Sequence, residues 1–172
     1  HISFNSLRQL EHHRPVWQAA GVSVGLRVNP EHSTQEGHAI YDPCAPCSRL
    51  GIPRAALGDA LPEGVEGLHF HTLCEQDAAP LVETFEAFEK KFGQFLHGLR
   101  WLNLGGGHHI TRKGYDLAAL EALIRRIRET YGVEVYLEPG EAIALNSGTL
   151  ITTVMDVVEN GMPILILDAS AA

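Results

Sequence analysis

Short apolar runs alternate with amphipathic stretches along most of this chain, a pattern typical of alternating strands and helices. The runs that predict strands cover residues 1–5, 22–28, 67–71, 99–104, 133–137, 150–158 and 163–167. A helix led by Pro80 is predicted next to the third run, because its apolar residues recur at steps of four and three. These residues are Leu81, Phe85, Phe88, Phe92 and Phe95. Helices between short apolar strands indicate βαβ units and a parallel sheet.

Residues at the ends of the predicted helices support these boundaries. Ser6 and Gln9 have the spacing of a capping box, and Pro15 is expected to stop or kink the helix that they open. Asp116 is suited to cap the helix that follows the fourth run, and Gly132 stands where a glycine often ends one. The elements on both sides of residues 99–104 are therefore well delimited.

Length and chain ends indicate a single domain that is part of a larger fold. The chain has 172 residues, enough for one hydrophobic core, and no linker or repeat divides residues 1–172. It opens on His1 inside an apolar run and closes just after another that ends at Asp168. Complete domains seldom start and stop on core strands, so we expect a fragment.

Composition excludes several function classes. The formal net charge of −8 lacks the basic footprint of a nucleic-acid-binding protein, although an acidic surface suits a cationic substrate. No apolar run approaches the roughly 20 residues that span a membrane. Three cysteines are too few for a disulfide framework, which favours a reducing cytoplasm.

Chemically distinctive residues follow the predicted strands at the same end. They are Asn5, Arg27, His71, Gly105, Gly106, Gly107, Glu138 and Asp168. The carboxyl ends of parallel strands meet at one edge, and ligands bind at that edge in both barrels and open sheets. We therefore predict a binding site there.

Two turns at this edge suggest specific chemistry. Backbone amides of Gly105 to Gly107 would allow close approach of a phosphate, although a flexible turn is the alternative. Glu138, in Glu138-Pro139-Gly140, would serve as a general base, a metal ligand or the partner of a heterocyclic nitrogen. Its alternative is a solvated carboxylate at a turn.

Histidines and cysteines near the predicted edge leave several readings open. His71 is either a hydrogen-bonded core residue or a ring packed on the face of a cofactor, and Cys74 follows it in the same loop. His108 extends the glycine loop towards a pocket or towards solvent. The Cys44-Ala45-Pro46-Cys47 motif is compatible with zinc, joined by His69, His71 and Cys74, or with a redox pair. We expect instead a loop that lines a pocket.

Five segments in the same order resemble the carboxynorspermidine (carboxyspermidine) decarboxylases. They are Tyr41 to Pro46 with Ser48 to Gly51, Leu68 to Glu75, Asn103 to Thr111, Leu137 to Ala142 and Leu167 to Ala171. This family has the alanine-racemase-like, or ornithine-decarboxylase-like, fold (fold type III), in which a TIM barrel binds pyridoxal 5′-phosphate and a β-domain follows. The resemblance implies that residues 1–172 are an incomplete (β/α)8 barrel of about five or six βα units. The Schiff-base lysine and the β-domain would lie outside the chain, which alone would be inactive.

The resemblance also implies roles for individual residues. Glu138 would pair with the pyridine nitrogen and His71 would stack on the ring, and both are assigned as catalytic. Further cofactor-binding residues would be Gly105, Gly106, Gly107, His108 and Gly140. Glu141, which stands where related decarboxylases have arginine, and Cys74 are assigned to the substrate. No metal ligand is assigned.

The predicted function is decarboxylation of carboxynorspermidine or carboxyspermidine to norspermidine or spermidine, with a homodimer at full length. Three alternatives stay open. A diaminopimelate-type decarboxylase conflicts with Glu141, since arginine occupies that position in those enzymes. A zinc-dependent hydrolase would use some of the ten histidines and would hold stoichiometric zinc. A non-catalytic phosphate-binding barrel would bind the cofactor without turnover.

Overall fold

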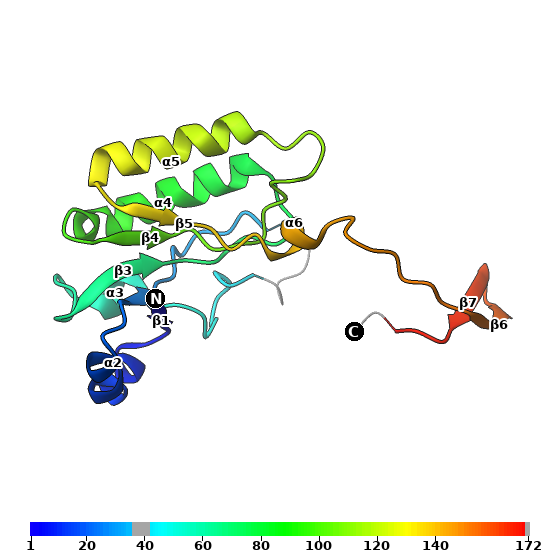
Figure 1. The fold of residues 1–172 in the computed structure, drawn as a ribbon, viewed down its shortest axis with the longest axis horizontal. Coiled ribbons are helices and arrows are strands. Elements are labelled where there is room, and N and C mark those ends of the chain that lie inside the picture. The colour runs from blue at the N-terminus through cyan, green and yellow to red at the C-terminus, as the bar shows by residue number, and fades with distance from the viewer. Residues whose placement is uncertain (36–41, 171–172) are drawn as a thin grey trace.

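A parallel five-stranded sheet forms the centre of the computed structural model, which describes residues 1–35 and 42–170 (Figure 1). Its strands are β1 (Ile2–Phe4), β2 (Val24–Arg27), β3 (Val65–His69), β4 (Trp101–Asn103) and β5 (Glu134–Tyr136). They lie side by side in chain order and every neighbouring pair is parallel. This confirms the predicted α/β class, the partial barrel-type sheet and the first five strand positions. Tyr41 and Ala171, quoted for the resemblance, lie outside the described residues.

Alternate strand residues bury one face of the sheet under two helices. Leu26, Leu68 and Leu102 are in register on β2, β3 and β4, and all three are fully buried. α4 (Ala78–Leu96) and α5 (Leu117–Tyr131) cover this face (Figure 1). Apolar burial of this kind is the main favourable contribution to folding, so this face holds the core.

The apolar stripe of α4 is the main contribution of the helix layer to that core. All five stripe residues predicted from the sequence are buried: Leu81, Phe85, Phe88, Phe92 and Phe95. The helix begins at Ala78, whose amide donates to the Asp77 side chain, so Pro80 lies in its first turn instead of leading it. No helix in the described part of the chain is both long and apolar enough to cross a membrane.

The other helix boundaries follow the predicted caps closely. The Gln9 amide donates to Ser6 Oγ, whereas the Gln9 side chain accepts from Asn5, one residue earlier than a capping box requires. α1 (Leu7–His12) ends at His13, which also caps α2 (Arg14–Ala20), so Pro15 lies in the first turn of this second helix. Asp116 caps α5, and a left-handed Gly132 ends it. The short α3 (Arg54–Leu57) follows Pro53.

On the opposite face of the sheet, one large ring lies across two glycines. Gly25, Gly67 and Trp101 are in register on β2, β3 and β4. A Cβ at Gly67 would come within 2.1 Å of the Trp101 ring, and one at Gly25 within 2.4 Å. The indole Nε1 donates to Ser23 Oγ at 2.8 Å. The ring therefore fills the space that two side chains would otherwise occupy.

The last two apolar runs form strands, but not in the parallel sheet. β6 (Val154–Glu159) and β7 (Pro163–Leu167) pair antiparallel as a separate hairpin, which follows α6 (Gly140–Ala144) and an extended stretch (Figure 1). The connection 160–162 is too short for the crossover that parallel strands need. The expectation that Asp168 joins the others at the sheet edge is therefore wrong. Asp168 instead accepts hydrogen bonds from Thr152 and Thr153.

Candidate active site at the carboxyl edge of the sheet

The carboxyl ends of β2 to β5 bring the predicted polar residues together. Arg27, His69 and Asn103 are in register on β2, β3 and β4. They form a row on the face of the sheet that carries Trp101, opposite α4 and α5, which we call the inner face. His71 and Glu138 lie two residues beyond β3 and β5, one step further along the same face. Parallel pairing thus places Arg27, His71 and Glu138 together, as predicted. Asn5, also predicted at this edge, instead contacts Arg49 and Gly51 of the long loop after β2.

Glu138 is the centre of this cluster. Its Oε1 accepts a hydrogen bond from Asn103 Nδ2 at 2.8 Å. Its Oε2 lies 3.3 Å from His71 Nδ1 and 3.7 Å from His69 Nε2. One carboxylate oxygen is therefore fixed by an amide, while the other faces two imidazoles.

The surroundings keep Glu138 ionised and His69 neutral. Burial alone would raise the pKa of Glu138, but the hydrogen bond from Asn103 and the nearby histidines outweigh it, and this pKa lies below its ordinary value. Burial lowers the pKa of His69 to about 4, an effect that the Glu138 charge only partly offsets. Because His69 is therefore uncharged at neutral pH, Asn103 is the main contact that holds the Glu138 anion.

Arg27 is a fixed positive charge beside this anion. Burial lowers its guanidinium pKa, and the Glu138 charge opposes that effect. Its Nη2 donates to the carbonyl of His71 at 3.1 Å. Arg27 therefore ties the end of β2 to the loop after β3.

The glycine loop packs tightly between two other loops. A Cβ at Gly106 would come within 2.1 Å of the Glu138 carbonyl oxygen, and one at Gly107 within 1.9 Å of the Leu73 carbonyl oxygen. The loops after β3, β4 and β5 thus meet at backbone contact distance, which explains why Gly106 and Gly107 have no side chain. The Gly105 amide donates to the Asn103 side chain. Among the described residues, no acceptor pairs with the amides of Gly106 and Gly107.

A cleft of about 680 Å³ opens beside His71. Its walls are Arg27, His71, Leu73 and Cys74 together with the described part of the long loop, residues 42–50 except Cys44. Cys44, Cys47 and Cys74 are free thiols, and burial raises the pKa of Cys44. The expectation that the cysteine loop lines a pocket is confirmed.

The remaining predicted residues lie around the glycine loop. His108 is buried, its Nδ1 is 3.2 Å from the Tyr115 hydroxyl, and burial lowers its pKa. Glu141 lies in α6, with its Oε1 3.5 Å from Nδ1 of the buried His109. Gly140 starts α6, and its amide donates to the Glu138 carbonyl. The contact between His109 and Glu141 was not anticipated.

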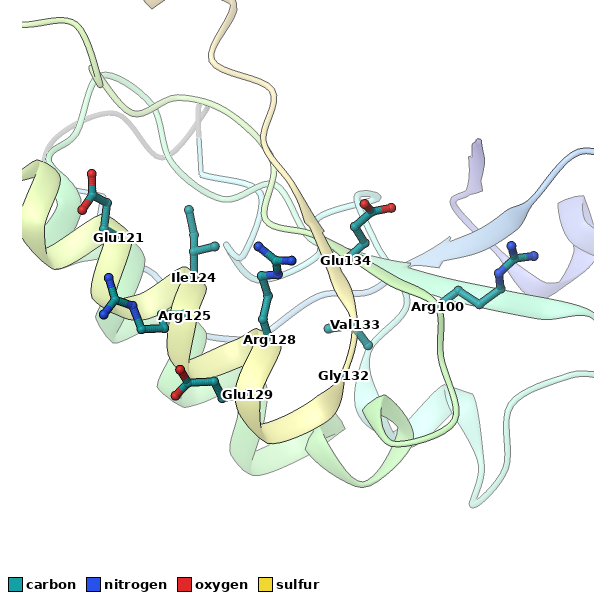
Figure 2. Close-up of a pocket in the computed structure, with 9 residues that line it drawn as sticks. All are labelled: Arg100, Glu121, Ile124, Arg125, Arg128, Glu129, Gly132, Val133 and Glu134. Atoms are coloured by element: carbon teal, nitrogen blue, oxygen red, sulfur yellow. The ribbon is translucent and has the colours of Figure 1, made fainter.

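Sequence reasoning missed Asn103 and gave His69 only a place in a zinc motif. A signal for both was present, because each lies two residues before an assigned residue on the same strand face, His71 and Gly105. A larger cavity of about 780 Å³ lies between α5 and β5, lined by residues such as Arg125, Arg128 and Glu134 (Figure 2). None of the predicted site residues lines it, so its size does not identify the site.

Comparison with known proteins supports the predicted relationship. The chain is 44% identical over 171 residues to a carboxynorspermidine/carboxyspermidine decarboxylase of Campylobacter jejuni, covering 99% of the chain and 44% of that protein. It is 42% identical over 160 residues to a carboxyaminopropylagmatine decarboxylase of Synechocystis sp., covering 92% and 41%. No protein-family model matches the chain.

A solved structure gives the same result. The crystal structure of carboxynorspermidine decarboxylase from Campylobacter jejuni in complex with norspermidine matches with a TM-score of 0.82 and 43% identity, covering 99% of this chain and 43% of that one. The chain therefore spans less than half the length of the curated relatives that it matches. Over that span, the chain is a homologue of the carboxynorspermidine/carboxyspermidine decarboxylases, and the resemblance predicted from its motifs is confirmed.

Proposed function

We propose that the protein containing this chain decarboxylates carboxynorspermidine or carboxyspermidine with pyridoxal 5′-phosphate as cofactor. The observation that carries the proposal is the Glu138 carboxylate, held by Asn103 beside the glycine loop in a chain homologous to these decarboxylases. Norspermidine or spermidine would be the product. The Campylobacter jejuni relative is a carboxynorspermidine/carboxyspermidine decarboxylase, which supports this substrate class.

The described residues fit this cofactor at both of its polar ends. The amides of Gly106 and Gly107, which have no acceptor among the described residues, are suited to phosphate oxygens, which backbone N–H groups bind well. The ionised Glu138 is suited to a protonated ring nitrogen, because opposite charges at hydrogen-bond distance stabilise each other. When bound, the cofactor supplies the electron sink that a decarboxylation needs.

Residues of the chain would keep the cofactor ring oriented and its nitrogen protonated. Glu138 would hold a proton on the ring nitrogen of the bound cofactor, and Asn103 fixes the orientation of that carboxylate through Oε1. His71, whose side chain is partly exposed beside the cleft, would pack on the ring face. Its present contact with Glu138 Oε2 would then be replaced by the ring nitrogen. His108 and Gly140 are proposed to complete the pocket for the cofactor.

Further parts of the active site are proposed to come from outside the chain. The Lys91 ammonium donates to Glu31, and neither Lys90 nor Lys113 lies at the strand ends beside Glu138. The lysine that binds the cofactor is therefore proposed to lie elsewhere in the protein. A homodimer in the cytoplasm is proposed with it.

The first test measures CO₂ release by the full-length gene product loaded with pyridoxal phosphate. We expect release from carboxynorspermidine or carboxyspermidine, and a loss of kcat by roughly 10²–10³-fold in Glu138→Gln, because the anion that stabilises the charged ring is removed. Carboxyaminopropylagmatine and diaminopimelate serve as competing substrates. Absence of turnover with a bound cofactor would favour the non-catalytic barrel, and turnover of diaminopimelate alone would overturn the substrate.

Glu141 is proposed to face the cationic substrate, with Cys74 on the cleft wall. Its side chain is half exposed, and its described ion-pair partner is His109. We expect Glu141→Gln to raise the substrate KM and to leave kcat almost unchanged, since a uniform binding contact is lost. Glu121→Gln on the outer helix α5 is the matched control. An unchanged KM in Glu141→Gln would count against this role.

A further inference from the structure

Three side chains at the strand ends direct potential metal-binding atoms towards one point. His69, His71 and Glu138 each offer one ligand atom, and these atoms lie within 4.8 Å of one another. They come from the inner face of β3, the loop that follows it and the loop after β5. The sheet itself therefore fixes their spacing.

The distances are close to those that a metal ion imposes. Glu138 Oε2 lies 3.3 Å from His71 Nδ1 and 3.7 Å from His69 Nε2. Ligand atoms about 2.0–2.2 Å from a tetrahedral zinc ion stand roughly 3.3–3.5 Å apart. The two carboxylate-imidazole distances therefore need little change, whereas the two imidazole nitrogens, which lie within 4.8 Å of each other, would approach each other on binding an ion.

The ring nitrogens of His69 make no hydrogen bond in the described structure. The residue is 9% exposed, and no hydrogen-bond partner among the described residues reaches either Nδ1 or Nε2. Buried polar atoms normally have partners, because leaving them unsatisfied is unfavourable. A metal ion at this point would give one of these ring nitrogens the partner that it lacks among the described residues.

Glu138 is already supported in the way that metal-binding carboxylates often are. Its Oε1 accepts from Asn103 Nδ2, which leaves Oε2 directed at both histidines. Such outer partners orient a ligand and raise metal affinity. Arg27 acts in the opposite direction, since its positive charge lies close to the same carboxylate. A divalent ion would therefore bind against some repulsion.

We propose that His69, His71 and Glu138 bind a divalent transition-metal ion, with zinc as the reference ion, when no cofactor is present. Two imidazoles and one carboxylate are a donor set that zinc and its neighbours in the first transition row accept, with one position left for water. His71 borders the cleft, so an ion could reach the three side chains from that side. The metal site does not depend on the proposed function.

Its consequence does depend on the proposed function, because Glu138 is the residue proposed to pair with the cofactor ring. A metal ion and a protonated ring nitrogen would compete for this one carboxylate, and binding both would place two positive charges side by side. Zinc and pyridoxal phosphate would therefore exclude each other. The ion would act as a competitor of cofactor loading and would not take part in the reaction.

The experiment titrates zinc chloride into the full-length gene product, freed of pyridoxal phosphate, in competition with a chromophoric chelator. We expect one zinc ion per chain, and a loss of affinity in His69→Gln and Glu138→Gln that exceeds the roughly 10–100-fold cost of losing an outer partner. Asn103→Ala should fall within that 10–100-fold range. His109→Gln, another buried histidine at the same edge, should bind zinc like the unaltered protein.

Two results would overturn the proposal. One is tight zinc binding that persists in both His69→Gln and Glu138→Gln, with folding of each variant checked by circular dichroism. The other is loss of zinc in Cys44→Ser/Cys47→Ser, which would move the ion to the cysteine loop.

Preloading with pyridoxal phosphate should reduce zinc stoichiometry. If the cofactor does not bind at all, the proposed function fails while the zinc titration still decides the metal site.

Discussion

The parallel sheet and the β6–β7 hairpin are built from similar residues but differ in what surrounds them. Leu26, Leu68 and Leu102 of the sheet are fully buried under α4 and α5. Val157 and Ile166 of the hairpin are 55% and 44% exposed, and every residue of β6 and β7 is exposed. An apolar run thus identifies a strand, but it does not identify the strand that pairs with it or the helices that bury it.

The two regions also differ in the range of their contacts. In the sheet, each strand pairs with one that lies a helix or a long loop away in the sequence. In the hairpin, the partners are separated only by Asn160, Gly161 and Met162. A hairpin of two strands is marginally stable by itself in water. Changes in the sheet should therefore affect global stability, and changes in the hairpin should act locally.

The largest expected effect tests that contrast in the core. Phe88→Ala removes a fully buried ring that packs on Phe70 at a centroid distance of 4.9 Å. We expect a loss of about 3–5 kcal/mol in the free energy of unfolding, from lost transfer energy and a residual cavity. Val157→Ala in the hairpin should change it by less than about 0.5 kcal/mol. Urea unfolding followed by circular dichroism measures both, and equal losses would refute the contrast.

A second pair of substitutions separates backbone strain from crowding. Gly107 and Gly161 have φ values of +80° and +72°, but only Gly107 has a backbone atom in contact range of an added Cβ. Gly161→Ala should cost about 1–2 kcal/mol from its left-handed conformation within the hairpin, and should leave unfolding of the sheet almost unchanged. Gly107→Ala should cost about 1–3 kcal/mol more, because the Leu73 carbonyl must move.

Thermal unfolding of the two glycine variants provides the measurement. Equal shifts in Tm would show that the loops after β3 and β4 can separate at little cost. Such a result would also weaken the case for a rigid glycine loop beside Glu138. A larger shift for Gly107→Ala is the expected outcome.

The smallest effect concerns pH and the hairpin alone. Hydrogen bonds from the Thr152 side chain and the Thr153 backbone lower the pKa of Asp168. A depressed pKa means that these contacts stabilise the fold above the ordinary aspartate pKa of about 3.9 and are lost as pH falls through the lower folded value. The NMR resonance of the Thr153 amide should therefore shift at a pH below the ordinary aspartate pKa, and Asp168→Asn should abolish the shift. A transition at or above the ordinary pKa would contradict these contacts.

Much of the sheet could be predicted because its sequence pattern and its environment agree. The phenylalanine stripe of α4 has helical spacing and a core to enter, and Asp116 and Gly132 mark the ends of α5. The clustering of Arg27, His71 and Glu138 followed from parallel topology alone. Their common edge needed no knowledge of side-chain contacts.

The remainder could not be predicted, or was overlooked, for different physical reasons. The partner of Glu138 Oε1 depends on the register of β4 against β5, which periodicity does not give, so Asn103 was missed. The hairpin had a local signal, because Asn160-Gly161 between apolar runs favours a tight turn. Treating every apolar run as part of one sheet concealed that signal. The contact between His109 and Glu141 depends on α6, a short helix without a recognisable cap.

The Trp101 ring, which lies across Gly25 and Gly67, couples three positions that are far apart in the chain. In any lineage where position 25 or 67 acquires a side chain, the indole must be exchanged for a smaller residue, because the space is shared. Aligned homologues should accordingly conserve the summed volume at positions 25, 67 and 101 better than the identity at any one of them. Such compensation would allow the side chains at positions 25, 67 and 101 to change during evolution without altering the strands that carry Arg27, His69 and Asn103.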